Sequence, residues 1–246
     1  LGSALRGQHY DDNTSATGLK SEAGTTLKNL PDNRWIPSLF AQLEWLTSES
    51  VRLNTGMRMD YQKDHGWIPS PSASLKISAG DATTLRFNAG TGFRIVNLFT
   101  EDHAAYSGSR TTVLLENLDP ERSFNGTASL QRVFDINSNP LTVDLEGFYT
   151  YFTNKIEPDY SRPNQIVYAN LQGSSITRGG SLTLSQSLTT MPLTYTVGAT
   201  LMDVFIKEDG ISQPLEFAPE YQGIVNATYR LPMDMRLDFT MTLTGP

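Results

Sequence analysis

Hydrophobic and polar residues alternate with a period of two along most of this chain. In residues 84–94 the odd positions are mostly apolar, whereas the even positions are polar, charged or glycine. Because successive side chains of a β-strand point to opposite faces of the sheet, this pattern predicts a strand with one apolar face. Such alternation predicts ten strands, at residues 39–46, 51–61, 72–78, 84–94, 124–134, 141–152, 176–188, 193–204, 221–231 and 235–244, and residues 1–10 are expected to form the end of an eleventh.

The connections between these strands fall into two groups. Short polar turns are predicted at residues 47–50, 79–83, 135–140, 189–192 and 232–234. Longer links, rich in Pro, Gly, Asn and Asp, are predicted at residues 62–69, 97–122, 154–172 and 206–219, and residues 11–31 share their composition. Short and long connections are therefore expected to alternate strictly, which places the short turns at one end of a sheet built of hairpins.

The length of the strands favours a membrane protein. Most of the predicted strands have about 9–13 residues, whereas strands of soluble proteins average about 5–6. A tilted strand of about 9–11 residues crosses the hydrocarbon core of a bilayer, and only helices or closed barrels pair every backbone group there. Short turns at one end and long loops at the other are typical of outer-membrane barrels. The sequence therefore predicts an all-β fold, a transmembrane antiparallel β-barrel in a Gram-negative outer membrane.

The two faces of this barrel are expected to meet different surroundings. The apolar face would contact outer-membrane lipid. The polar face would line the interior with Arg52, Arg58, Arg86, Asp144, Glu146, Arg230 and Asp238. Aromatic residues near strand ends are expected to form girdles at the two interfaces: Trp35, Trp45, Tyr61, Phe93, Phe134, Tyr149, Tyr151, Tyr195, Phe205, Tyr221 and Tyr229.

Alternation alone leaves a soluble secreted β-sheet module open, because soluble sandwiches and barrels also alternate. An open sheet of ten or eleven strands would expose two long edges, so the strands that close the barrel are expected outside these residues. We therefore expect residues 1–246 to form one partial barrel domain, cut from a longer chain that begins before Leu1 and continues after Pro246.

Composition narrows the chemistry. The 246 residues hold 19 Lys and Arg against 26 Asp and Glu, a net charge of −7, which argues against a nucleic-acid partner. With no Cys and only three His, neither a metal centre nor another cofactor is predicted. The Asp-His neighbours at residues 64–65 and 102–103 would point apart on an extended chain, so no catalytic residues and no enzyme are predicted.

Three motifs carry a resemblance to a known family. Residues 90–94 read Gly-Thr-Gly-Phe-Arg and include Gly92, Phe93 and Arg94; residues 97–101 begin Asn97-Leu; residues 117–123 read Asn-Leu-Asp-Pro120-Glu121-Arg-Ser. With the aromatic segment 148–156, the Arg178-Gly179 pair that follows Asn170, and Phe-Ala-Pro at 217–219, this order resembles the barrel of TonB-dependent outer-membrane receptors. The residues of these motifs are most similar to those of receptors of the Bacteroides group. Ser181 departs from the pattern, where many members carry Glu.

The resemblance implies a barrel of 22 strands, of which this chain would supply about ten or eleven. It also implies partners outside these residues: an N-terminal plug domain of the same protein, the TonB complex, and a surface lipoprotein. The function implied is active uptake of a scarce small-molecule or glycan nutrient, such as siderophore-iron, haem, cobalamin or an oligosaccharide. A passive porin-like barrel is the alternative, and a plug upstream of Leu1 would decide between them.

The sequence names ligand-binding candidates only by their place in the predicted external loops. They are the loop residues able to stack on a ligand, pair with it or ligate it: His65, Trp67, His103, Tyr106, Tyr160 and Arg162. Solvated loop histidines are the plainer interpretation of His65 and His103, and Trp67 and Tyr160 also suit an aromatic girdle. Gly92, Phe93, Arg94, Asn97, Pro120, Glu121, Arg178 and Gly179 are expected to be structural, with Arg94 and Glu121 pairing near the outer rim.

Overall fold

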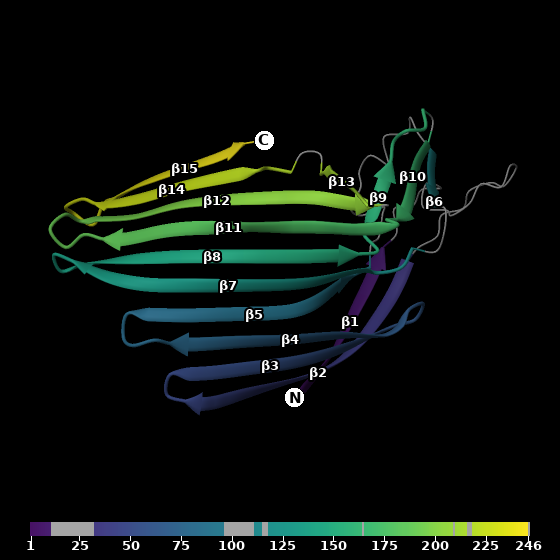
Figure 1. Ribbon diagram of the computed structural model, residues 1–246, viewed down its shortest axis with the longest axis horizontal. Helices are drawn as coiled ribbons and strands as arrows, with labels where there is room; N and C mark the ends of the chain where they lie inside the picture. Colours follow the sequence, from purple (N-terminus) through teal and green to yellow (C-terminus); the bar gives the residue numbers. More distant parts are fainter. Residues whose placement is uncertain are drawn as a thin grey trace, which may run out of the picture.

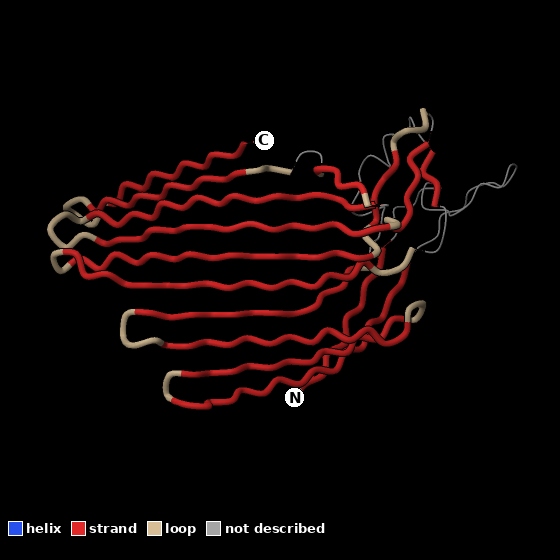
Figure 2. The backbone as a smooth tube through the Cα atoms, viewed as in Figure 1, coloured by secondary structure: helices blue, strands red, loops and turns tan. Residues whose placement is uncertain are grey.

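The computed structural model describes residues 1–10, 32–95, 111–114, 118–163, 165–208, 210–215 and 218–245, and every element in these ranges is a strand (Figures 1 and 2). Eleven strands follow one another in a main sheet in chain order. They are β1 (Gly2–Tyr10), β2 (Asp32–Ser48), β3 (Val51–Gln62), β4 (Gly66–Ser78), β5 (Thr83–Arg94), β7 (Glu121–Ile136), β8 (Asn139–Thr153), β11 (Gly173–Ser187), β12 (Leu193–Glu208), β14 (Tyr221–Arg230) and β15 (Arg236–Gly245).

Every neighbouring pair in the main sheet is antiparallel. The strands are nine to 17 residues long, so most are long enough to cross a bilayer at a tilt. The ten predicted strands and the eleventh at residues 1–10 are confirmed. Within the described residues, β1 and β15 are the two margins of the sheet.

The five predicted short turns lie together at one end of the sheet, which we call the turn end; the opposite end is the loop end (Figure 2). At the turn end, β7 and β8 are joined through Asn137 and Ser138, whose φ angles are 52° and 64°. Two consecutive positive φ angles are typical of the type I′ hairpin, whose twist matches that of the paired strands. The short turns predicted from composition are therefore confirmed.

The strict alternation of short and long connections is wrong at one place. Residues 62–69 were expected to be a long link, but only residues 63–65 separate β3 from β4. The misleading signal was Pro69 and Pro71, which lie within β4 opposite Met59 and Met57. Pairing of β4 with β5 begins only at Ser72, so the two prolines sit where β4 has β3 alone as a ladder partner, a position that tolerates a missing N–H.

A second, smaller sheet lies at the loop end. Its order is β6 (Thr111–Leu114), β10 (Gln165–Asn170) and β9 (Ile156–Asp159), with β6 parallel and β9 antiparallel to β10. A fourth short strand, β13 (Ile211–Pro214), pairs with the end of β12. These strands fall in segments that the sequence pattern predicted as long links. Four to six residues are too few to display a reliable period.

The two faces of the main sheet differ in chemistry as predicted. Cross-strand rows such as Leu85–Leu130–Leu145–Leu182 run along one face. These side chains are open to the surroundings: Leu145 is 53% exposed and Leu237 is 64% exposed. No second layer covers this face in the described part of the chain, which argues against a water-soluble sandwich. Here the apolar face is called outward and the polar face inward.

The inward face is tied together by side-chain hydrogen bonds that cross from strand to strand. Arg86 Nη2 donates to Gln131 Oε1 at 3.4 Å, and Gln131 Nε2 donates to Asp144 Oδ2 at 2.7 Å. Ser74, Asn88 and Thr127 form a second row. No helix among the described residues is long and apolar enough to cross a membrane.

Candidate functional site

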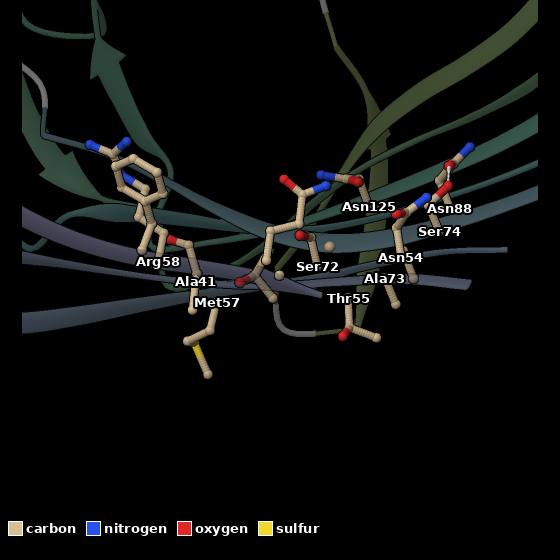
Figure 3. A pocket seen from close by; sticks show the side chains of 17 residues that line it. Ala41, Asn54, Thr55, Met57, Arg58, Ser72, Ala73, Ser74, Asn88 and Asn125 are labelled. Carbon is tan, nitrogen blue, oxygen red and sulfur yellow. Dashed lines mark hydrogen bonds between the residues drawn. The ribbon is translucent and has the colours of Figure 1, made fainter. Parts of the chain in front are cut away.

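The inward face is hollowed where β2–β5 and β7 lie side by side. A cavity of about 550 Å³ is lined there mainly by small and amide side chains from consecutive strands. Figure 3 shows Arg58, Ser72 and Ser74 on one side of the strands, whereas Met57 and Thr55 extend to the other side. The strand alternation therefore gives this stretch a mostly polar wall, in which Phe40, opposite Arg58, is a large apolar side chain.

A second cavity, of about 670 Å³, lies toward the loop end and shares Arg58 with the first. We call it the basic hollow. Its polar lining residues are Arg6, Gln8, Arg34, Arg58, Asp60, Gln62 and Arg94. Four arginines outnumber the carboxylates of Asp60, in the lining, and Glu121, which pairs with Arg94, so the basic hollow is positive although the whole sequence is negative. Such a lining favours an anionic occupant.

Asp60 fixes one wall of the basic hollow. Its carboxylate is buried and accepts hydrogen bonds from Ser38 Oγ at 2.5 Å and from Arg58 Nε and Nη2, both at 2.8 Å. Arg58 Nη2 also donates to Ser38 Oγ at 3.0 Å. A charged network with this many mutual bonds holds the Arg58 guanidinium in one orientation. Arg58 thus presents a positioned cation to both cavities.

Gln62 is the second notable group in this wall. It is 5% exposed, and its Nε2 has no hydrogen-bond partner among the residues that the structure describes. A buried donor left without a partner costs free energy, so such groups are rare unless a further molecule satisfies them. Gln62 Nε2 is therefore a candidate donor to whatever fills the basic hollow.

The predicted Arg94–Glu121 pair is confirmed, and it does more than close a rim. Arg94 Nε donates to Glu121 Oε2 at 2.7 Å, while Glu121 Oε1 accepts from the Ile156 backbone N–H at 2.9 Å. Ile156 begins β9. The buried Glu121 carboxylate thus joins β5 and β7 of the main sheet to the small sheet beside the basic hollow.

Asn170, at the end of β10, makes the second link at this junction. Its Oδ1 accepts from the Asp119 backbone N–H at 2.7 Å, and its Nδ2 donates to the carbonyls of Asp119 and Asn154 at 3.0 and 2.7 Å. Behind these bonds Ile166 and Tyr168 are buried, with Leu118 and Ile156 packed against them. The three hydrogen bonds of Asn170 and the Glu121–Ile156 bond therefore tie the small sheet to the segments beside β7 and β8.

The predicted ligand-binding residues do not gather in the basic hollow. His65 lies in the turn between β3 and β4. Trp67 is not a loop residue: it lies in β4 opposite Tyr61, with ring centroids 5.3 Å apart, as a girdle residue would. Tyr160 and Arg162 lie between β9 and β10, and both are exposed. His103 and Tyr106 lie outside the described residues, and no observation tests the binding role of the six.

The connection between β9 and β10 is nevertheless ordered by charge. Ser161 donates to Asp159 from its side chain and from its backbone N–H, the latter at 2.8 Å, and Arg162 adds attraction. These interactions lower the pKa of the Asp159 carboxyl below its usual range. The Asp159 carboxylate and Ser161 thus form a polar contact within this connection.

The family-motif residues that the structure describes lie in the long strands or directly before them. Gly92 lies opposite Ser123 on the inward face, and Pro120 is buried before β7. A side chain at Gly179 would collide with the Leu201 carbonyl oxygen and the Phe148 ring, so the position needs glycine. Phe93 lies opposite Arg122 on the outward face, and Arg178 faces outward opposite Asp203; Asn97 lies outside the described residues.

Arg6, Arg34 and Gln62 are site residues that the sequence analysis missed. All three occupy inward positions. Arg6 lies in residues 1–10, which were expected only as the end of an eleventh strand, and Arg34 and Gln62 lie outside the strands predicted at residues 39–46 and 51–61. The signal was present, because Arg6, Gln8, Arg34 and Asp60 all fall at loop-end inward positions, but it needed the register between strands. Within the described residues no three His, Asp or Glu side chains group as metal ligands.

Comparison with known proteins gives the family. The family model described as "TonB dependent receptor-like, beta-barrel" matches residues 2–244. The chain belongs to this family of outer-membrane receptors, and the described strands are a segment of its barrel. Membership of this family also gives the orientation in the membrane: the turn end is periplasmic and the loop end is extracellular.

Relatives and solved structures agree with this assignment. An "Iron-regulated outer membrane virulence protein" of Vibrio cholerae is 31% identical over 119 residues, which is 48% of this chain and 18% of that protein. The ferric enterobactin receptor of Pseudomonas aeruginosa, in a mutant bound to enterobactin, is 23% identical, with a TM-score of 0.76 over 99% of this chain and 38% of that one. The siderophore receptor PirA of Acinetobacter baumannii is 18% identical, with a TM-score of 0.75 over 98% and 38%.

The chain thus spans well under half the length of these proteins. The predicted outer-membrane barrel of a TonB-dependent receptor is confirmed, and the soluble-module alternative is wrong. The family and its solved neighbours are receptors rather than enzymes. The similarity to Bacteroides receptors, the plug domain, the TonB complex and the surface lipoprotein stay predictions.

Proposed function

We propose that the protein containing this chain takes up anionic ferric siderophores across the outer membrane, with energy delivered through TonB. The observation that carries the proposal is the basic hollow, in which four arginines and the unpaired Gln62 Nε2 face the interior at the extracellular end. An anionic iron chelate would be attracted by the excess of arginines, and its oxygens would offer an acceptor to Gln62 Nε2.

The comparisons support iron as the cargo class. The Vibrio cholerae relative is named for iron regulation, and the solved neighbours are named as receptors for ferric enterobactin and other siderophores. Haem, cobalamin and glycans, which the sequence pattern alone admitted, have no comparable support. Membership of a TonB-dependent family also favours energised uptake over a passive porin.

The arrangement suggests a sequence of binding events. The arginines raise the local concentration of an anion at the mouth of the barrel. Arg58 belongs to both cavities, so an anion in the basic hollow lies next to the wall of Asn54, Ser72 and Asn88 deeper inside. That wall offers hydrogen bonds without strong charge, which favours passage over tight retention.

Binding to the whole receptor tests the proposal. Arg6→Gln combined with Arg34→Gln removes two cations while leaving the Arg58–Asp60 network intact. The variant loses two charged hydrogen bonds, each worth roughly 1.5–3 kcal/mol, so we expect affinity for a ferric tris-catecholate to fall about 100- to 10,000-fold. Affinity for an electroneutral ferric hydroxamate should change little.

The matched control is Arg230→Gln, which removes an inward-facing cation near the periplasmic end. Tight catecholate binding should survive in that variant, and labelled-iron uptake should require TonB. Unchanged catecholate affinity in the Arg6/Arg34 variant would contradict the basic hollow as the site. Uptake that continues in cells without TonB would instead favour a passive barrel.

A further inference from the structure

On the described strands, the charged residues of the outward face lie in one sector of the barrel wall. In the described long strands, the registers place five charged residues at outward positions, all on β7, β11 or β12: Arg122, Arg132, Arg178, Asp203 and Lys207. The outward positions of β1–β5, β8, β14 and β15 hold apolar, small or uncharged polar residues. The charge is therefore localised rather than spread around the wall.

Four of the five lie toward the extracellular end, and we call Arg122, Arg178, Asp203 and Lys207 the outer basic patch. Arg122 and Lys207 close the two ends of one row, Arg122–Thr153–Ser174–Lys207. Three strand spacings separate them, or about 14 Å. Both side chains are exposed. Directly below this row runs an aromatic and aliphatic row, Phe124–Tyr151–Ile176–Phe205.

Arg178 and Asp203 lie one outward row below the aromatic one. Arg178 Nη2 donates to Asp203 Oδ2 at 2.8 Å, and the two side chains are 59% and 53% exposed. The Arg178 guanidinium also lies 5.2 Å from the centroid of the Phe205 ring. Since Asp203 balances only one of the three cations, the patch as a whole is positive.

We propose that the outer basic patch binds the phosphorylated headgroup of a lipid in the outer leaflet. Charged side chains on the lipid face of a barrel are tolerated near the interface rather than in the middle of the bilayer. At that depth the anions that lipids offer are headgroup phosphates, and Arg and Lys bind them. The aromatic row below would contact the glycerol or sugar and the first acyl carbons, as interfacial rings do.

The patch is separate from the basic hollow. It lies on the opposite face of the wall, so a siderophore inside the barrel and a lipid outside it do not compete for the same residues. The inference therefore stands independently of the proposed function. A lipid held at β7–β12 would also rest beside the strands that lead into the junction of Glu121 and Asn170.

Lipid retention by the whole receptor tests this inference. The probes are diphosphorylated lipid A and its fully dephosphorylated form, each added to receptor purified in a mild detergent and counted by native mass spectrometry. Arg122→Gln and Lys207→Gln should each reduce retention of the phosphorylated form about fivefold, and the double variant about 25-fold. Retention of the dephosphorylated form should be weak in all of them.

Lys76→Gln combined with Arg86→Gln is the matched control, because it removes two cations from the inward face of neighbouring strands. This control should retain lipid A like the unaltered receptor, and so should Arg122→Lys, which keeps the charge. If the double variant does not assemble, the two single variants carry the same test.

Two results would overturn the inference. One is equal retention of phosphorylated lipid A by the unaltered receptor and the Gln variants. The other is full displacement of lipid A by an equal concentration of inorganic phosphate, which would show a general phosphate site rather than a lipid site. Siderophore binding in the same variants is expected to remain unchanged.

Discussion

The barrel wall and the small extracellular sheet place their large apolar side chains differently, because one faces lipid and the other faces water. In the wall, large apolar side chains point outward and stay exposed, as Leu145 and Leu237 do. In the small sheet, Ile166, Val167 and Tyr168 are buried to within 2–3% exposure. Within a few residues, the chain therefore changes from a wall whose apolar side chains face lipid to a sheet whose apolar side chains are buried, as in a soluble protein. The junction at Glu121 and Asn170 lies where the two arrangements meet.

The comparison predicts that truncation harms the small sheet most. Ile166→Ala would leave a cavity in the core of that sheet and should destabilise it locally by about 2–5 kcal/mol. Hydrogen exchange of β10 amides in the whole receptor measures the effect. Ile211→Ala on the exposed strand β13 is the control, and its amides should exchange as before. Equal effects of the two variants would mean that the small sheet has no core of its own.

Charge should harm the wall most, and only on its outward face. Leu145→Arg places a cation in the apolar belt and should lower the free energy of unfolding from lipid vesicles by about 2–4 kcal/mol. Glu146→Arg, one residue further and facing the interior, is the control and should have a much smaller effect. A denaturant titration of both variants measures the difference, and similar losses would remove the distinction between the faces.

The junction can be loosened without disturbing either sheet. Asn170→Ala removes three hydrogen bonds and should weaken the attachment by about 1–3 kcal/mol. Limited proteolysis within residues 154–172 should become faster, while heat-modifiable migration of the barrel on gels should stay the same. Asn226→Ala in β14 is the matched control and should leave the cleavage pattern unaltered. Protection that persists in Asn170→Ala would show that Glu121 alone holds the sheets together.

Exposed ion pairs of the interior should matter least. Arg52 Nε lies 3.0 Å from Glu44 Oε1, and both side chains are about half exposed. Their coupling should not exceed about 1 kcal/mol. A double-mutant cycle of Arg52→Ala and Glu44→Ala, followed by unfolding in vesicles, gives the value. A markedly larger coupling would mean that water is excluded from this part of the lumen.

The wall could be predicted from the sequence because a single rule governs it. A strand with lipid on one side and water on the other must alternate, so residues 84–94 reveal β5 almost to the residue. The small sheet could not be predicted in this way. Its strands have four to six residues, and β6 pairs with β10 across more than 50 residues of chain, as Thr111 does with Gln165. Pairing at that distance depends on tertiary structure rather than on local pattern.

The residues of the candidate site also differ in whether local sequence or tertiary structure identifies them. The Arg94–Glu121 pair was predictable because both residues belong to recognisable motifs. Arg6 and Arg34 were not, since nothing local distinguishes an arginine in the basic hollow from one elsewhere in the interior. Only the register of β1 on β2, and of β2 on β3, brings them to the cavity that Asp60 and Gln62 line.

The late start of β4–β5 pairing has a mechanical consequence. Residues 66–71 of β4 pair with β3 alone, and residues 91–94 of β5 pair with β7 alone. In the described residues, β4 and β5 are therefore not paired on the extracellular side of Ser72 and Gly90. The ladder of backbone hydrogen bonds between β4 and β5 therefore stops before the extracellular ends of these two strands. A force along the barrel axis would act most strongly where this pairing is missing. Backbone amides there should exchange with deuterium before those of the other strands.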